Sequence, residues 1–124
     1  MSKTHLILIA HGSKDQRWRE PFEKIVSEIG NEAGTENVSL CYMEFAKPTI
    51  EDVIEIAIKN NFISFKILPL FMSNGGHVSN DIVSKVQELN VKYPSIEIKL
   101  LSAICEDPLI MGAIVAIASS YIKT

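Results

Sequence analysis

The stretch "LILIAHGS" (residues 6–13) decides the fold of this 124-residue chain. Five apolar residues in a row are typical of a strand that is covered on both faces, as in a parallel sheet flanked by helices. The run ends in His11, Gly12 and Ser13, so the first strand is expected to deliver a histidine to a turn. The chain has only three histidines, which makes the placing of this one informative.

Strand-like and helix-like patterns alternate along the rest of the chain. The strand-like stretches are residues 5–10, 38–46, 62–71 and 95–103. The helix-like stretches are residues 18–32, 48–61, 78–90 and 107–123. Thr49 and Asp52 have the spacing of a capping box at the start of the second helix. The order predicts a single α/β domain over residues 1–124. We expect a three-layer sandwich with a four-stranded parallel sheet, right-handed crossovers and flavodoxin-like (βα)₄ topology.

Composition and charge exclude several kinds of partner and location for this chain. A net charge of −3, without a basic run, argues against nucleic acid as a partner. Cys41 and Cys105 lie far apart without metal-ligand spacing, so we expect reduced thiols. The apolar start is too short for a secretory signal, and the longest apolar run (residues 109–118) is half a membrane span. We therefore expect a cytoplasmic protein that does not enter membranes.

Candidate catalytic residues lie where strands end. In open parallel sheets the ligand crevice lies outside the carboxyl ends of the strands. His11, Glu44 and His77 fall at three such junctions, and two imidazoles with a carboxylate make a metal-ligand or acid–base set. For each residue alone, a hydrogen-bonded structural role stays open. His5 starts the same strand as His11, ~20 Å away at ~3.3 Å per residue, and receives no role.

The same junctions carry candidate substrate-binding residues. They are Ser13, Lys14, Lys47, Ser73, Asn74, Gly75 and Gly76. The glycine pair would let backbone amides approach a ligand, and the helix that follows it would favour an anion. The serines and the asparagine can donate hydrogen bonds, and the lysines can meet carboxylates. An ordinary turn for the glycines and a solvated surface role for the lysines remain open.

Several common uses of this architecture are excluded. Neither the GxGxxG dinucleotide fingerprint nor the GxxxxGK[ST] phosphate loop is present. A receiver domain would need acidic residues where this chain has Ala10 and His11. Phosphatases that use a phosphohistidine begin with Arg-His-Gly. Here Ala10 replaces that arginine, and the whole chain has only Arg17 and Arg19.

Three motifs together indicate a family. "LILIAHGSKD", "YMEFAKPTIEDVI" and "ILPLFMSNGGHVSNDI" resemble, in order and spacing, the short CbiX-type sirohydrochlorin cobaltochelatases. These are class II tetrapyrrole chelatases related to siroheme ferrochelatases and to nickel-inserting enzymes. The resemblance covers nearly the whole chain.

The resemblance implies an enzyme of cobalamin or siroheme-type biosynthesis that inserts a metal into sirohydrochlorin. It implies that His11 and His77 bind the metal and act in catalysis, with Glu44 assisting. The metal substrate is expected to be Co²⁺, with Fe²⁺ or Ni²⁺ as alternatives, and no organic cofactor is expected. It also implies a homodimer, which the apolar run at residues 109–118 favours. A non-catalytic metal or tetrapyrrole carrier and, more distantly, a phosphohistidine phosphatase are the rival functions.

Overall fold

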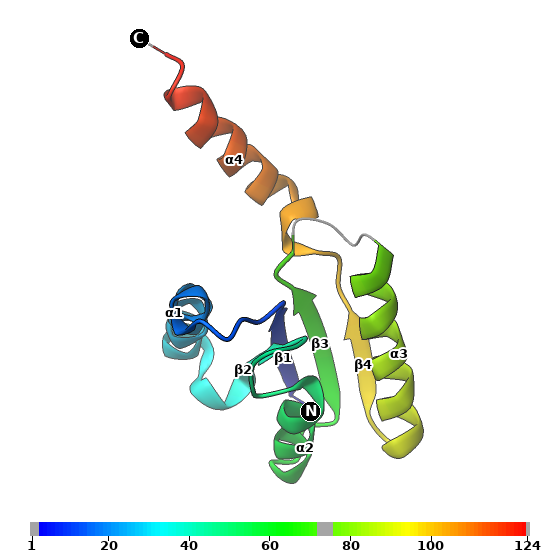
Figure 1. Ribbon diagram of the computed structural model, residues 1–124. Helices are drawn as coiled ribbons and strands as arrows, with labels where there is room; N and C mark the ends of the chain where they lie inside the picture. The colour runs from blue at the N-terminus through cyan, green and yellow to red at the C-terminus, as the bar shows by residue number, and fades with distance from the viewer. Residues whose placement is uncertain (1–2, 72–75, 124) are drawn as a thin grey trace.

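The computed structural model describes residues 3–71 and 76–123, and it confirms the alternation of strands and helices (Figure 1). The elements, in chain order, are β1 (Thr4–Ala10), α1 (Gln16–Ala33), the 3-10 turn η1 (Thr35–Asn37), β2 (Val38–Tyr42), α2 (Ile50–Lys59), β3 (Ser64–Pro69), α3 (Gly76–Lys92), β4 (Glu97–Leu100), the 3-10 turn η2 (Ile104–Glu106) and α4 (Pro108–Ser120).

The sheet has the strand order β2-β1-β3-β4, and every pair is parallel. From β1 the chain crosses to β2 on one side and then returns to β3 on the other side. The strand order therefore reverses between β1 and β3. Such a switch point is where open α/β sheets bind ligands. The predicted α/β fold with flavodoxin-like strand order is confirmed.

The main core lies on the sheet face covered by α2 and α3. Alternate strand residues such as Ile7 and Ile67 pack there against Ile54 of α2 and Ile82 of α3. Two ion pairs, each 3.1 Å long, link α2 to α3 through Glu51–Lys85 and Glu55–Lys92. The opposite face of β1 and β2 lies under α1, and Figure 1 shows α1 and α3 on opposite sides of the sheet.

Side-chain caps fix the first residues of α1 and α2, and so the ends of the loops that precede these helices. Asp15 caps α1 by accepting the Arg17 backbone N–H at 3.0 Å, so this helix starts two residues before the predicted position. The predicted capping box of α2 is confirmed. Asp52 accepts the Thr49 N–H at 3.0 Å, and the Asp52 N–H donates to the Thr49 hydroxyl at 3.2 Å. These caps leave the residues between strand and helix free to form the edge of the site.

The predicted second strand was too long. It continues to residue 46 in the prediction, but β2 ends at Tyr42 and residues 43–47 bend back over the edge. Phe45 has φ 64°, which no strand accommodates, and the Tyr42 N–H donates to the Pro48 carbonyl oxygen at 3.0 Å. The third and fourth strands are also shorter than predicted. Helix α3 begins at Gly76, which the prediction placed in the preceding turn.

Helix α4 departs from the predicted sandwich. It runs away from the sheet (Figure 1), and none of its residues is buried. Among the described residues, no neighbouring loop therefore buries α4. Within residues 3–71 and 76–123, no helix is long and apolar enough to cross a membrane.

Candidate functional site

The first two junctions are joined by backbone hydrogen bonds at the carboxyl edge of the sheet. The Met43 N–H donates to the Ala10 carbonyl oxygen at 2.9 Å, and the Glu44 N–H donates to the His11 carbonyl oxygen at 3.1 Å. The loop after β2 is thus fastened to the turn after β1. His11 and Glu44, which the sequence placed on one edge, are brought together there through their main chains.

Gly12 makes this close approach sterically feasible. Its φ is +95°, a conformation that side-chain-bearing residues rarely adopt. A Cβ at this position would also overlap the carbonyl oxygen of Glu44. The glycine of the His-Gly-Ser motif is therefore required for the contact between the two loops.

The His11 side chain is exposed and lies toward the end of β3. Its ring centroid is 4.4 Å from that of Phe71, with the two planes tilted by 41°. Phe71 is buried and follows β3 directly, so the His11 ring sits at the switch point between β1 and β3. This position faces the start of the third junction.

The third junction is only partly described. His77 belongs to the first turn of α3 by its backbone, as does Gly76, while the position of the His77 side chain lies outside the described part. Ser73, Asn74 and Gly75 lie outside the described residues. Among the side chains that the structure describes, no three His, Cys, Asp or Glu residues lie close enough to hold a metal ion. The metal-binding pair His11–His77 therefore stays a prediction.

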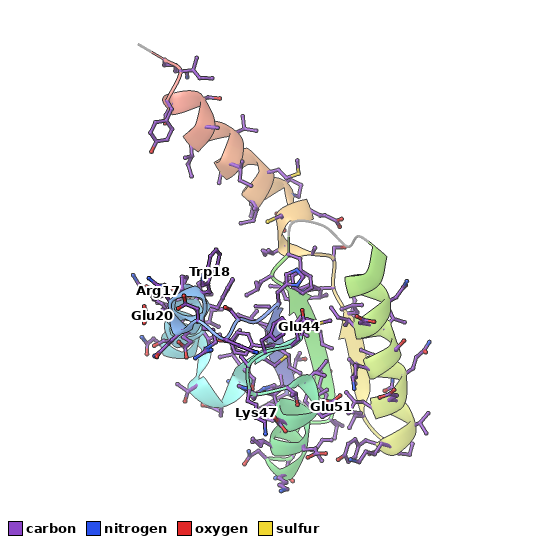
Figure 2. The ribbon with its side chains drawn as sticks, in the orientation of Figure 1. Arg17, Trp18, Glu20, Glu44, Lys47 and Glu51 are labelled. Carbon is purple, nitrogen blue, oxygen red and sulfur yellow. The ribbon has the colours of Figure 1, made fainter. Side chains whose placement is uncertain are left out.

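Glu44 and Lys14 lie on exposed parts of the two joined loops. Figure 2 shows Glu44 at the carboxyl edge, above α2. The Lys14 ammonium lies 5.7 Å from the centroid of the Phe45 ring, a cation–π distance that joins the two loops a second time. Lys14, which was predicted to meet a substrate carboxylate, therefore lies beside Phe45, the sequence neighbour of Glu44, at the same edge of the sheet.

Ser13 has local hydrogen bonds. Its hydroxyl oxygen accepts the Asp15 N–H at 3.0 Å, and its carbonyl oxygen accepts from the Arg19 guanidinium at 2.6 Å. Both bonds shape the turn that leads into α1. The hydroxyl hydrogen is still available to a ligand, because the oxygen acts only as an acceptor in this bond.

Lys47 lies apart from the other candidates. It lines a shallow surface hollow with Asp52 and Lys59 on α2, and Figure 2 shows it farther from the carboxyl edge than Glu44. The pKa of Asp52 is lowered mainly by the Thr49 backbone N–H of the capping box, with Lys47 adding a weaker electrostatic effect. The structure therefore does not bring Lys47 together with Lys14.

Two exposed aromatic side chains at the edge escaped the sequence analysis. Phe45 is 59% exposed and adopts φ 64°, while Trp18 of α1 is 70% exposed (Figure 2). The sequence analysis missed Phe45 because an apolar residue fitted the second strand, which was predicted to be too long. Two features of the sequence could have indicated that Phe45 lies in a bend. They are the bend-favouring "KP" at residues 47–48 and the acidic residue beside Phe45.

A pocket of about 330 Å³ lies below the edge, between α2 and α3. Its charged lining residues are Glu51, Asp81 and Lys85, with Ile9 and Met43 among the apolar ones. Burial alone would raise the pKa of Glu51, but the Lys85 ammonium at 3.1 Å holds this pKa below its usual range. The pair links α3 to α2 at the wall of this pocket.

Comparison with known proteins agrees with the motifs. The family model described as CbiX matches residues 5–120. The sirohydrochlorin ferrochelatase of Priestia megaterium is 24% identical over 93 residues, 75% of this chain and 35% of the relative. The sirohydrochlorin cobaltochelatase of Methanopyrus kandleri is 27% identical over 77 residues, 62% of this chain and 54% of the relative. The chain thus spans about half, or less, of the length of these curated relatives.

Solved structures show the same fold. The CbiX protein of Marinobacter aquaeolei superposes with a TM-score of 0.85 at 29% identity, over 98% of this chain and 96% of that chain. The sirohydrochlorin chelatase SirB of Bacillus subtilis subspecies spizizenii, solved in complex with cobalt, superposes with a TM-score of 0.71 at 21% identity, over 79% of this chain and 42% of that chain. Since the family model spans nearly the whole sequence, the chain belongs to the CbiX family.

Proposed function

We propose that this chain is a sirohydrochlorin chelatase that inserts a divalent metal, Co²⁺ in the first instance, into the tetrapyrrole. The observation that carries the proposal is the exposed His11 ring at the switch point, on a turn whose His11 carbonyl oxygen accepts the Glu44 N–H at 3.1 Å. Membership of the CbiX family supports the reaction class. Named chelatases among the relatives support the substrate.

The reaction exchanges two pyrrole protons for one metal ion. Imidazole nitrogen is a borderline ligand that suits Co²⁺, Fe²⁺ and Ni²⁺, and it also accepts protons near neutral pH. In the proposal, His11 and His77 hold the incoming ion and replace part of its water shell. The two protons leave the ring as the nitrogens bind the metal. One goes to an imidazole released from the ion and the other to the Glu44 carboxylate or to water.

The macrocycle is proposed to lie on the exposed edge. The pocket of about 330 Å³ is at the lower end for small-molecule sites, so a tetrapyrrole cannot enter it. Phe45 and Trp18 offer flat apolar surface to the ring. Lys14 and the Ser13 hydroxyl are proposed to meet substrate carboxylates, together with Ser73, Asn74, Gly75, Gly76 and the more distant Lys47.

Iron and nickel are the competing metals. The relatives named above include both a ferrochelatase and a cobaltochelatase, and ligand type does not separate the metals. We place the reaction in the cytoplasm, in cobalamin or siroheme-type synthesis, without an organic cofactor. We also propose a homodimer, because the match covers 75% of this chain but only 35% of the Priestia megaterium ferrochelatase, so that relative has room for a second half of this kind.

The test is anaerobic incubation of the wild-type chain with sirohydrochlorin and, separately, Co²⁺, Fe²⁺ or Ni²⁺, followed by absorbance. We expect insertion faster than in protein-free solution, with Co²⁺ turned over most efficiently. Fastest turnover with Fe²⁺ or Ni²⁺ would contradict the metal assignment only. A spectral shift of bound substrate without any insertion above the uncatalysed rate would establish a carrier and contradict the enzyme.

A further inference from the structure

Helix α4 is apolar on all sides and has no partner within its own described chain. Over Pro108–Ser120 it contains no charged residue and buries none of its side chains. All of its long apolar side chains except Ile110 are exposed, from 46% for Ile114 to 83% for Leu109. Soluble monomers rarely expose a continuous apolar surface of this kind, so such a surface marks a docking site.

The sheet carries a matching open place. Helix α1 lies over β2, and no helix of the described residues covers the same face of β3 and β4. Strand residues that point to this face alternate with the core residues Phe65 and Ile67. Lys66, Glu97 and Lys99 on this face are exposed, and Lys66 is directly paired with Lys99. In a three-layer sandwich a helix would cover these positions.

The open place becomes apolar toward the carboxyl edge, where α4 leaves its own sheet. Leu68, Leu70 and Leu101 are half-buried there. The lysines lie toward the amino end, where their aliphatic stems can cover an apolar helix while the ammonium groups stay in water. Each chain therefore has one unpartnered apolar helix and one vacant helix position.

We propose that two copies of this chain exchange their α4 helices, each α4 covering the open face of β3 and β4 in the other copy. The uncovered sheet face and the unpacked helix of one chain are complementary to the helix and the sheet face of a second copy. A twofold axis therefore forms the same helix–sheet contact twice. The proposal deepens the proposed homodimer by stating which elements hold it together, but it is argued from packing alone.

The area involved is sufficient for a stable dimer. A helix of 13 residues is ~20 Å long and ~10 Å wide. Half of its surface is ~300 Å², and the receiving face loses a similar area. Reciprocal exchange doubles both, giving ~1,200 Å², at the lower limit of standard interfaces. Further contacts between the two copies, outside the α4 helices, would add to this buried area.

The first test is the assembly state of the full-length chain by sedimentation and light scattering. We expect a dimer at micromolar concentration. Replacing Ile114 and Ile117 together by Glu should raise the dissociation constant by at least ~100-fold, with the circular dichroism of a folded monomer. Val91→Glu is the matched control, because Val91 is apolar and 83% exposed on α3. It should leave the dimer intact.

The second test locates the contact. In a Cys105→Ser background, copies with Ile114→Cys are mixed with copies with Lys66→Cys and treated with a short bismaleimide. The remaining Cys41 should not react, because burial raises the pKa of its thiol to about 12. We expect covalent heterodimers. A chain carrying both substitutions should likewise form dimers rather than an internal link.

Three results would overturn the exchange. One is a dimer that survives the double Glu substitution, which would leave the proposed homodimer standing. Another is an internal link within monomers, which would mean that α4 folds back on its own sheet. The last is a monomer whose α4 binds zwitterionic phosphatidylcholine vesicles instead. Metal insertion is measured separately, so the proposed reaction and the helix exchange can fail independently.

Discussion

Two histidines at opposite ends of β1 have opposite surroundings. His5, at the amino end, is 3% exposed, lies 2.7 Å from the Ser39 hydroxyl through Nε2, and packs edge-on against Phe62 at 4.8 Å. His11, at the carboxyl end, is exposed on a turn that a glycine holds against the next loop. One strand thus carries a structural histidine and a candidate metal ligand. The edge of the sheet, and not the residue type, separates them.

The contrast follows from the topology. At the amino edge the chain arrives from helices and packs its side chains into the core, so a polar group there must find a partner inside. At the carboxyl edge the loops leave toward solvent and diverge at the switch point, so side chains there stay accessible to a ligand. The predictions below test whether the two edges differ in this way.

The largest effect on stability is expected from a methyl group at the turn after His11. Gly12→Ala should destabilise the fold by ~2–4 kcal/mol and slow metal insertion at least ~10-fold, because of its positive φ and the overlap with Glu44. Thermal unfolding and insertion rates measure both effects. For stability, the control is Gly112→Ala in the monomeric Ile114→Glu and Ile117→Glu background, since nothing in the described chain lies within 4 Å of its Cβ position. That variant should be ~0.5–1 kcal/mol more stable. Equal behaviour of the two variants would contradict the fixed turn.

At the amino edge, His5→Ala should lower stability without lowering the rate. Removing a buried ring that contacts Phe62 and leaving Ser39 without its partner should cost ~2–3 kcal/mol. The rate per folded molecule, measured well below the unfolding temperature, should stay within ~2-fold of the wild type. A large loss of rate in fully folded His5→Ala would remove the distinction between the edges.

Acid should weaken the fold through His5. Burial lowers the pKa of His5, against a smaller opposing effect of the Glu36 backbone. The unfolded chain therefore binds this proton first as the pH falls through the ordinary histidine value of ~6.5, and stability falls below that pH. The unfolding temperature of the wild type should drop more between pH ~7.5 and ~5 than that of His5→Leu. Identical drops would show that His5 contributes nothing.

The smallest effect is expected at the strained aromatic residue. Phe45→Gly should raise KM for the tetrapyrrole by ~3–10-fold, because it removes a ring at the site, while stability stays equal or rises. Asn61→Gly is the matched control at the amino edge, since Asn61 also has a positive φ, of 72°. It should leave KM unchanged. Steady-state kinetics and thermal unfolding of the two variants distinguish the loss of the Phe45 ring from a general effect of placing glycine at a positive φ.

Much of the fold could be predicted because local patterns and tertiary structure agree. The apolar run into His11 is β1, and the capping box at Thr49 starts α2 as predicted. The carboxyl-edge rule placed His11 beside Glu44 and set His5 apart from both. These features depend on periodicity and on general rules of parallel sheets, which a single sequence carries.

The failures have physical causes that a single sequence does not carry. Residues 43–46 look like strand because Met43, Phe45 and Ala46 are apolar, but they bend back since the Glu44 N–H donates to the His11 carbonyl oxygen in the turn after β1. Lys47 follows this bend and faces α2 instead of the edge. The composition of α4 indicated a helix, but its direction depends on contacts outside the local sequence.

In the proposed reaction, the metal is inserted at the carboxyl edge of β1. The most direct measurement compares anaerobic Co²⁺ insertion into sirohydrochlorin by His11→Ala and His5→Ala, at a temperature where both are folded. The account predicts that His11→Ala loses at least ~100-fold in rate with an unchanged unfolding temperature, while His5→Ala keeps its rate with a lowered one. Near-normal insertion by His11→Ala would contradict the account.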